Sequence, residues 1–172
     1  CTFLEVGLLT VKTEGNPAFL LEAEAAVLEH ANAGDWFANE VLQHMKRVLK
    51  RVDMTSKTLL ALVEPGSCFA GSFAELVLTA DRSYLLDAPG EGKDKDKDSQ
   101  IILSPINDGP LLMGNGLTRL QTRFYGDAAA VEKLKPSMKE SKPFVGTAAE
   151  KAGLVTFARD DIDYPDEIRL FV

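Results

Sequence analysis

The residues best suited to chemistry lie between Thr58 and Leu86, in the segment TLLALVEPGSCFAGSFAELVLTADRSYLL. Its apolar run predicts a buried strand, its small residues predict a turn, and a helix is expected to begin near Ser72. Backbone N–H groups at such a helix start can hold a carbonyl oxygen while it becomes an oxyanion. Gly71 and Ser72 are therefore candidate donors to a polarised carbonyl group.

The same residues have a purely structural interpretation, which we favour. The tetrapeptide SFAE is an S-x-x-E capping box, in which Ser72 caps the helix and Glu75 accepts from its backbone N–H. Gly71 is then an ordinary turn glycine. A second box of this kind is predicted further along, from Thr147 and Glu150.

Cys68 lies in the same loop and is a candidate thiol base or nucleophile. A reactive cysteine needs a neighbouring histidine or cationic site, and the only histidines, His30 and His44, both fall in predicted helices. We therefore interpret Cys68 as a small buried side chain. The histidines lack the i, i+4 spacing of a helical metal pair, and the acidic run DDID is interpreted as a polar turn, so no metal site is expected.

A cluster of cations ends the helix predicted over residues 36–52. Its members are Lys46, Arg47, Lys50 and Arg51. A functional interpretation makes Lys46, Arg47 and Lys50 a seat for the phosphates of coenzyme A. The structural alternative, which we favour, is that these cations lie at the negative end of a helix dipole on a solvated face.

The composition is that of an ordinary globular protein of one domain. The 172 residues carry a formal net charge of -7 and a mean hydropathy of -0.04, so nucleic acid and anionic membranes are not expected partners. No apolar run approaches the roughly 18 residues of a membrane span. Only Cys1 and Cys68 are present, which excludes a disulfide framework and indicates a reducing, cytoplasmic compartment.

Strands and helices alternate along the chain, which predicts an α/β fold with parallel strand pairs. Residues 90–99, GEGKDKDKDS, have nothing to bury and predict a solvated, mobile loop. The 36–52 helix, with Asp35 as its N-cap, carries an apolar stripe of Phe37, Val41, Met45, Val48 and Val52. Strands are expected over 3–13, 58–63, 83–86, 100–103 and 154–157, and helices over 18–32, 36–52, 73–80, 117–124, 127–134, 147–152 and from Pro165.

Three runs resemble the crotonase (enoyl-CoA hydratase/isomerase) superfamily. The first is the strand LALV followed by a glycine-containing loop, Glu75-Leu76 and Ala80-Asp81. The others are GNGLTRL over residues 114–120 and AAEKAGLV over residues 148–155. The resemblance implies a crotonase-like spiral of repeated ββα units, incomplete at both ends, in a segment of a longer polypeptide.

The resemblance also implies roles for particular residues. The superfamily's hydration chemistry uses two convergent carboxylates, of which Glu75 matches the first, and an oxyanion hole, where Ser72 stands at a glycine position. The second carboxylate is expected within residues 100–107, which contain no Asp or Glu, and the downstream Asp108 sits in a turn. No loop of the family's F-S-x-G-x-D type follows the first strand. The site therefore lacks half of its machinery.

The longer runs VEPGSCFAGSFAEL, NGLTRL and GLVTF are similar to a double-length branch of the superfamily, lyases that open a dihydroxylated ring without molecular oxygen. This similarity implies a scaffold, which packs on the catalytic N-terminal half of the same chain and forms part of a homo-oligomer. The substrate of the whole protein is then an acyl-CoA thioester, and no separate cofactor is implied. Two alternatives stay open, a stand-alone enoyl-CoA hydratase or isomerase that uses Glu75, and an acyl-CoA binding module without turnover.

Overall fold

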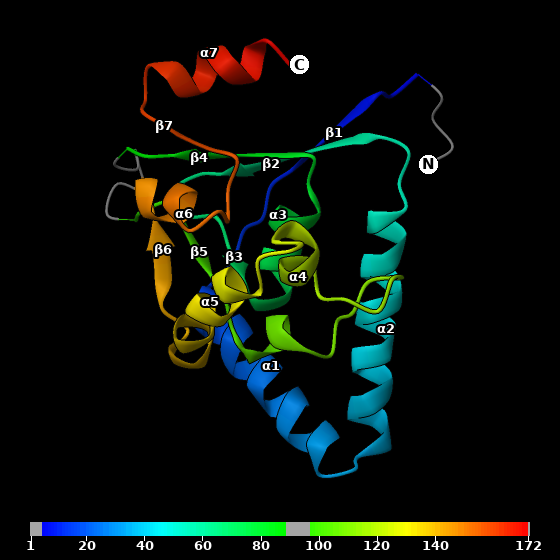
Figure 1. Ribbon diagram of the computed structural model, residues 1–172. Helices are drawn as coiled ribbons and strands as arrows, with labels where there is room; N and C mark the ends of the chain where they lie inside the picture. The colour runs from blue at the N-terminus through cyan, green and yellow to red at the C-terminus, as the bar shows by residue number, and fades with distance from the viewer. Residues whose placement is uncertain (1–4, 89–96, 172) are drawn as a thin grey trace.

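The computed structural model describes residues 5–88 and 97–171, which form two small sheets with helices around them (Figure 1). One sheet has four parallel strands in the order β1-β2-β4-β7: β1 (Leu8–Val11), β2 (Thr58–Val63), β4 (Arg82–Leu86) and β7 (Phe157–Arg159). The other has the order β3-β5-β6: β3 (Phe69–Ala70), β5 (Gln100–Ile102) and β6 (Pro143–Val145), with only β6 antiparallel to its neighbour.

In its central part the chain enters both sheets before each helical stretch. After β2 and β3 come the turn η1 (Gly71–Phe73) and helix α3 (Ala74–Thr79). After β4 and β5 come η3 (Pro105–Asp108), α4 (Arg119–Arg123) and α5 (Ala128–Glu140), and α6 (Thr147–Lys151) joins β6 to β7. The two turns that begin at β2 and β4 thus each add one strand to each sheet, as the predicted ββα spiral requires, whereas β1 leads directly into α1 and α6 lies between β6 and β7.

Strand β2 is the centre of the core because both of its faces are covered. Leu59, Ala61 and Val63 pack in the main cluster with residues of α3, whereas Leu60 and Leu62 pack with Tyr164 of helix α7 (Asp163–Arg169). Figure 1 shows α7 on one side of the four-stranded sheet and α3, α4, α5 and α6 on the other. A continuous apolar run is what a parallel strand buried on both faces requires.

Helices α1 (Pro17–Asn32) and α2 (Trp36–Asp53) form a hairpin that extends away from the sheets (Figure 1). The predicted N-cap of α2 is confirmed, because Oδ1 of Asp35 accepts from the Ala38 N–H at 2.8 Å. The predicted stripe is wrong in part, since Phe37 and Val48 are 63% and 44% exposed. Met45 and Val52 of the stripe do pack, partly buried, against the core. The side chains that α2 buries most fully each follow a stripe residue by one position, and they are Ala38, Leu42 and Leu49.

Several predicted boundaries also move. The first strand keeps only four residues of the predicted run, whose residues 3 and 4 lie outside the described part. The last strand begins at Phe157, because Leu154 and Val155 are buried in the turn after α6. Helix α5 continues through Pro136 because Met138 anchors its last turn in the core. Most of the predicted 90–99 loop lies outside the described residues, and Ser99 at its end is buried.

The central position of β4 predicts a large effect of truncation there. We expect Leu85→Ala, in the main core cluster, to lower the free energy of unfolding by about 2–5 kcal/mol, because it leaves a cavity between sheet and helices. Leu170→Ala is the matched control, since Leu170 is exposed, and should change it by less than about 0.5 kcal/mol. Urea denaturation followed by circular dichroism measures both, and equal losses would contradict this core assignment.

Candidate functional site

The segment from Thr58 to Leu86 places the Gly71–Ser72 peptide between the end of β3 and the start of α3. Gly71 has a φ of 49°, which turns the chain from extended strand into η1. Its carbonyl oxygen accepts from Nδ2 of Asn107 at 2.9 Å, and the Ser72 N–H donates to Oε1 of Glu24 at 2.9 Å. Because a peptide group is planar, these two bonds fix its orientation from both sides.

Glu24, from the middle of α1, fills the space beside this peptide. Its side chain is 6% exposed, and a Cβ atom added to Gly71 would lie 1.9 Å from Oε2 of Glu24. That second oxygen has no hydrogen-bond partner among the described residues. The N–H group that the sequence suggests as an oxyanion donor is therefore occupied by a side chain of the same molecule.

Glu75 lies in the first turn of α3 and is 1% exposed. Its Oε1 accepts from Nδ2 of Asn107 at 2.5 Å, and its Oε2 accepts from Nη1 of Arg119 at 3.0 Å. No side-chain bond caps η1 or α3, so the predicted capping box of Ser72 and Glu75 is wrong. The carboxylate is drawn to a buried cation instead of the helix start. The box predicted for α6 is also wrong, since no side chain caps that helix.

Arg119 is the centre of this buried polar cluster and is itself 2% exposed. Its Nε and Nη2 donate to Oδ1 and Oδ2 of Asp53 at 3.0 and 2.7 Å. Nε also donates to Oγ1 of Thr79 at 2.8 Å, and Nη1 to the Leu111 carbonyl oxygen at 2.9 Å. Two carboxylates from α2 and α3 thus share one guanidinium through charge-assisted hydrogen bonds.

Burial dominates the electrostatics of the site. It raises the pKa of Glu75, against the bonds from Asn107 and Arg119, and the negative charge of Asp53 adds to the rise. Burial also raises the pKa of Glu24, against its bond from Ser72. The Cys68 thiol has a pKa raised by burial and by Glu24. A buried thiol of this kind is a poor nucleophile, and its burial confirms the structural interpretation of Cys68.

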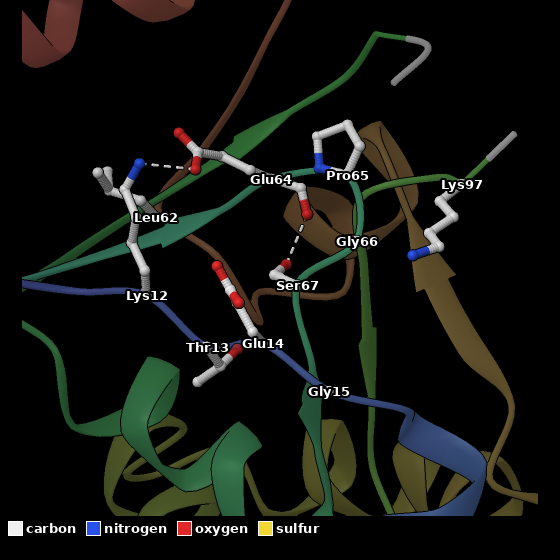
Figure 2. A pocket seen from close by; sticks show the side chains of 10 residues that line it. All are labelled: Lys12, Thr13, Glu14, Gly15, Leu62, Glu64, Pro65, Gly66, Ser67 and Lys97. Atoms are coloured by element: carbon white, nitrogen blue, oxygen red, sulfur yellow. Dashed lines mark hydrogen bonds and ion pairs between the residues drawn. The ribbon is translucent and has the colours of Figure 1, made fainter. Parts of the chain in front are cut away.

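Two adjoining clefts open at the carboxyl ends of β1 and β2, which is where open parallel sheets bind ligands. The cleft drawn in Figure 2 has a volume of ≈ 350 Å³, and its lining includes Lys12, Glu64, Ser67 and Lys97. Nζ of Lys12 lies 2.7 Å from Oε2 of Glu64, and the Ser67 hydroxyl donates to the Glu64 carbonyl oxygen at 2.6 Å. Glu75 is not among the residues that line either cleft.

The structure separates the predicted cations from these clefts. Lys46, Arg47 and Lys50 lie on α2 and line neither of them, and Nη2 of Arg47 is 3.7 Å from Oε2 of Glu40. The cations that do line the clefts are Lys12 and Lys97, which sequence reasoning did not select. A coenzyme A phosphate seat on α2 therefore stays a prediction without support from the geometry.

Sequence reasoning also missed Asp53 and Thr79 of the buried cluster, together with Arg119, Asn107 and Glu24. Arg119 stands within the run GNGLTRL, so the family resemblance carried a signal for it. Asn107 ends the stretch in which a second carboxylate was expected, and an amide was not considered there. Glu24 had no signal, because an acidic residue on a helix is normally solvent-exposed.

The part of the chain that the structure describes contains neither a metal-binding cluster nor a helix able to span a membrane. In ranges 5–88 and 97–171, no three His, Cys, Asp or Glu side chains gather to hold a metal ion. The DDID run forms the predicted polar turn, with Oδ1 of Asp160 accepting from the N–H groups of Ile162 and Asp163. No helix described there combines the length and apolar character needed to cross a bilayer.

Known proteins provide an independent comparison. The chain is 40% identical over 169 residues to benzoyl-CoA-dihydrodiol lyase of Aromatoleum evansii, a match that covers 98% of this chain and 29% of that protein. An enoyl-CoA hydratase from Shewanella pealeana has a TM-score of 0.57 at 14% identity, covering 99% of this chain and 57% of its own. An enoyl-CoA hydratase/isomerase from Cupriavidus metallidurans has a TM-score of 0.56 at 15% identity, covering 94% and 54%. No protein-family model matches the chain.

These findings confirm the predicted fold and the predicted resemblance. The solved structures share the fold of the chain, and the chain spans just over half of their lengths. It spans less than a third of the curated lyase that it matches.

The buried cluster predicts that Glu75 matters for stability. We expect Glu75→Gln to lower the free energy of unfolding by about 3 kcal/mol, because it breaks a buried ion pair. Loss of a capping-box carboxylate would cost only on the order of 1 kcal/mol or less. Urea denaturation measures the difference, with the exposed Glu29→Gln on α1 as the control. A loss for Glu75→Gln no larger than that of the control would contradict the cluster.

The raised pKa of Glu24 predicts a pH dependence. The folded state holds this proton more tightly than the unfolded state, so stability falls as pH rises from the ordinary value of 4.5 through the raised pKa. Glu24→Gln keeps the acceptor but cannot ionise. We expect the difference in free energy of unfolding between Glu24→Gln and the parent to shift in favour of the variant as pH rises over this window. Above the raised pKa of Glu24 this difference should stay constant. Urea denaturation between about pH 4 and pH 8 measures it, and exposed Glu22→Gln should show no such gain.

Proposed function

We propose that this chain, which has the crotonase fold, is a structural rather than a catalytic part of a CoA-thioester lyase similar to benzoyl-CoA-dihydrodiol lyase. The longer protein then acts on the dihydrodiol of benzoyl-CoA and opens its ring without molecular oxygen. Coenzyme A enters as part of the substrate, so the proposal requires no separate cofactor. The expected compartment is the cytoplasm.

The observation that carries this proposal is that the groups needed for chemistry are already engaged inside the molecule. A general base must reach a substrate proton, yet both oxygens of Glu75 accept hydrogen bonds from Asn107 and Arg119. An oxyanion donor must point at an open position, yet the Ser72 N–H donates to Glu24. Asn107, in the stretch expected to hold a second carboxylate, is a donor here and cannot act as a base.

Exposed apolar side chains on α2 support a scaffold role. Trp36 and Phe37, at the start of α2, are both largely exposed. Further along α2 lies an apolar groove of ≈ 230 Å³, lined by His44, Met45, Val48, Leu49, Val52, Ser72, Phe73 and Leu76. Exposed apolar surface on one helix is typical of an interface. We propose that it faces the catalytic part of the same protein, and that the assembled protein is a homo-oligomer.

A second candidate, binding of an acyl-CoA without turnover, is favoured by the clefts at the carboxyl ends of β1 and β2. Lys12 and Lys97 bring positive charge to that opening, although both already have partners, Glu64 in the case of Lys12. The clefts could admit part of a thioester ligand without placing it against Glu75. A stand-alone hydratase has no comparable support, because it needs Glu75 free.

The proposal predicts that the chain on its own neither hydrates crotonyl-CoA nor remains a monomer. Turnover is expected below about 1 s⁻¹, the low end for ordinary enzymes, because no base is free. Self-association is expected because the apolar surface of α2 has no cover in the isolated chain. A coupled hydratase assay and light scattering measure the two properties. A monodisperse monomer with a kcat above about 1 s⁻¹ would overturn the scaffold assignment.

Two further experiments distinguish the scaffold from the alternative functions. Isothermal titration of the chain with crotonyl-CoA tests the binding module, which alone predicts saturable heat without turnover. In the longer lyase, Glu75→Gln should leave kcat per folded molecule nearly unchanged, whereas loss of a catalytic base typically costs 10²–10⁴ in rate. A hundredfold loss of kcat in a soluble, folded Glu75→Gln variant would show that Glu75 takes part in catalysis.

A further inference from the structure

We propose that the Glu24 carboxyl group permanently fills the position beside the Gly71–Ser72 peptide. This is the position from which the oxygen of an acyl group would accept a hydrogen bond from the Ser72 N–H. One side chain of α1 thereby keeps this position closed to carbonyl ligands. The inference deepens the proposed function, because it names the group that closes the site.

The direction of the Ser72 N–H is the first support. The Gly71 carbonyl oxygen is held by Nδ2 of Asn107, and Asn107 is itself held by Glu75 and by the backbone, since its Oδ1 accepts from the Ser104 N–H at 2.8 Å. The peptide plane cannot turn without breaking these buried bonds. The Ser72 N–H therefore points at one fixed position, and Glu24 occupies it at 2.9 Å.

The space around Glu24 is the second support. Gly71 has no side chain, and the volume that a Cβ would take is filled by the Glu24 carboxyl group, 1.9 Å from the Cβ position. The side chain is 6% exposed and its Oε2 has no partner among the described residues. Only one oxygen of Glu24 is thus engaged, as with the single oxygen of a bound carbonyl. Removing the side chain would leave a void with one aligned N–H donor.

Such a void should accept a small carboxylate, so sodium acetate is the probe. We expect acetate to raise the melting temperature of Glu24→Ala, relative to sodium chloride at equal ionic strength. The extra rise should reach about 3–5 °C when acetate exceeds its dissociation constant tenfold. The parent and Glu24→Gln should show no extra rise, because their position is filled.

Two alanine variants of the same helix are the controls. Leu21→Ala removes a partly buried apolar side chain beside the Cys68, Ala70 and Ile102 cluster and so makes space without an N–H donor. Glu22→Ala removes an exposed carboxylate. Neither should respond to acetate beyond the chloride baseline. An equal response in Leu21→Ala, or none in folded Glu24→Ala, would overturn the proposal.

A second measurement uses the parent chain and so does not depend on the folding of a variant. The amide proton of Ser72, followed by nuclear magnetic resonance, should shift with pH as Glu24 titrates, and this shift should vanish in Glu24→Gln. A Ser72 amide signal that is insensitive to pH in the parent, or equally sensitive in both proteins, would exclude the contact. These outcomes are independent of turnover in the longer lyase, so failure here and failure of the scaffold assignment can be told apart.

Discussion

A guanidinium removed from water is the constraint that the rest of this structure satisfies. A buried cation left without partners costs several kcal/mol, so the carboxylates must be held around Arg119. Asp53 is the last residue of α2, Thr79 is the last of α3 and Arg119 is the first of α4. Their mutual bonds therefore fix three helix ends at one point. The α1–α2 hairpin, which extends away from the sheets in Figure 1, is joined to the core at this point by Asp53 and a second time by Glu24 of α1.

The same constraint explains why Glu75 and the Ser72 N–H, which are candidates for chemistry, form hydrogen bonds inside the molecule. A continuous series of buried hydrogen bonds runs from Arg119 through Glu75 and Asn107 to the Gly71–Ser72 peptide and ends at Glu24. Apart from Oε2 of Glu24, the side-chain groups in this series have partners, and buried networks of this kind are rigid. Strongly perturbed carboxyl groups often indicate an active site, but structural networks perturb them as well. For Glu75 and Glu24, burial is the largest cause of the raised pKa.

Local patterns predicted the elements well and the cluster poorly. Helix α1 begins one residue before its predicted start, and β2 has its predicted bounds, because apolar periodicity is a property of neighbouring residues. The S-x-x-E pattern at Ser72 failed because it specifies a local bond only when nothing stronger competes for the carboxylate. The competitor, Arg119, lies 44 residues further along. Glu24 meets Ser72 across 48 residues, and no local pattern encodes such a contact.

The fold class could be predicted because its motifs consist of residues close together in the sequence. The hydrogen bonds of the site could not, because they join side chains from distant turns of the spiral. Asn107 shows the difference. Its neighbourhood was searched for a carboxylate, yet the structure uses its amide to join Gly71 and Glu75. An amide side chain and a carboxylate side chain can occupy the same position in a sequence. Only the groups that each one contacts in the folded protein show which role it has.

The parallel pairing of β4 with β7 has a consequence for the order in which the chain assembles. Ser83 and Thr156, which bond to each other beside this pairing, are 73 residues apart. Closing so long a loop costs more entropy than pairing β2 with β4, and contacts of long sequence separation form slowly. Strand β7 lies at an edge of the described sheet, and α7 covers that sheet from its own side, through Tyr164 against Tyr84. We therefore expect the β7–α7 unit to dock after β2 has paired with β4, and amide exchange there to proceed while the spiral around β2 stays folded.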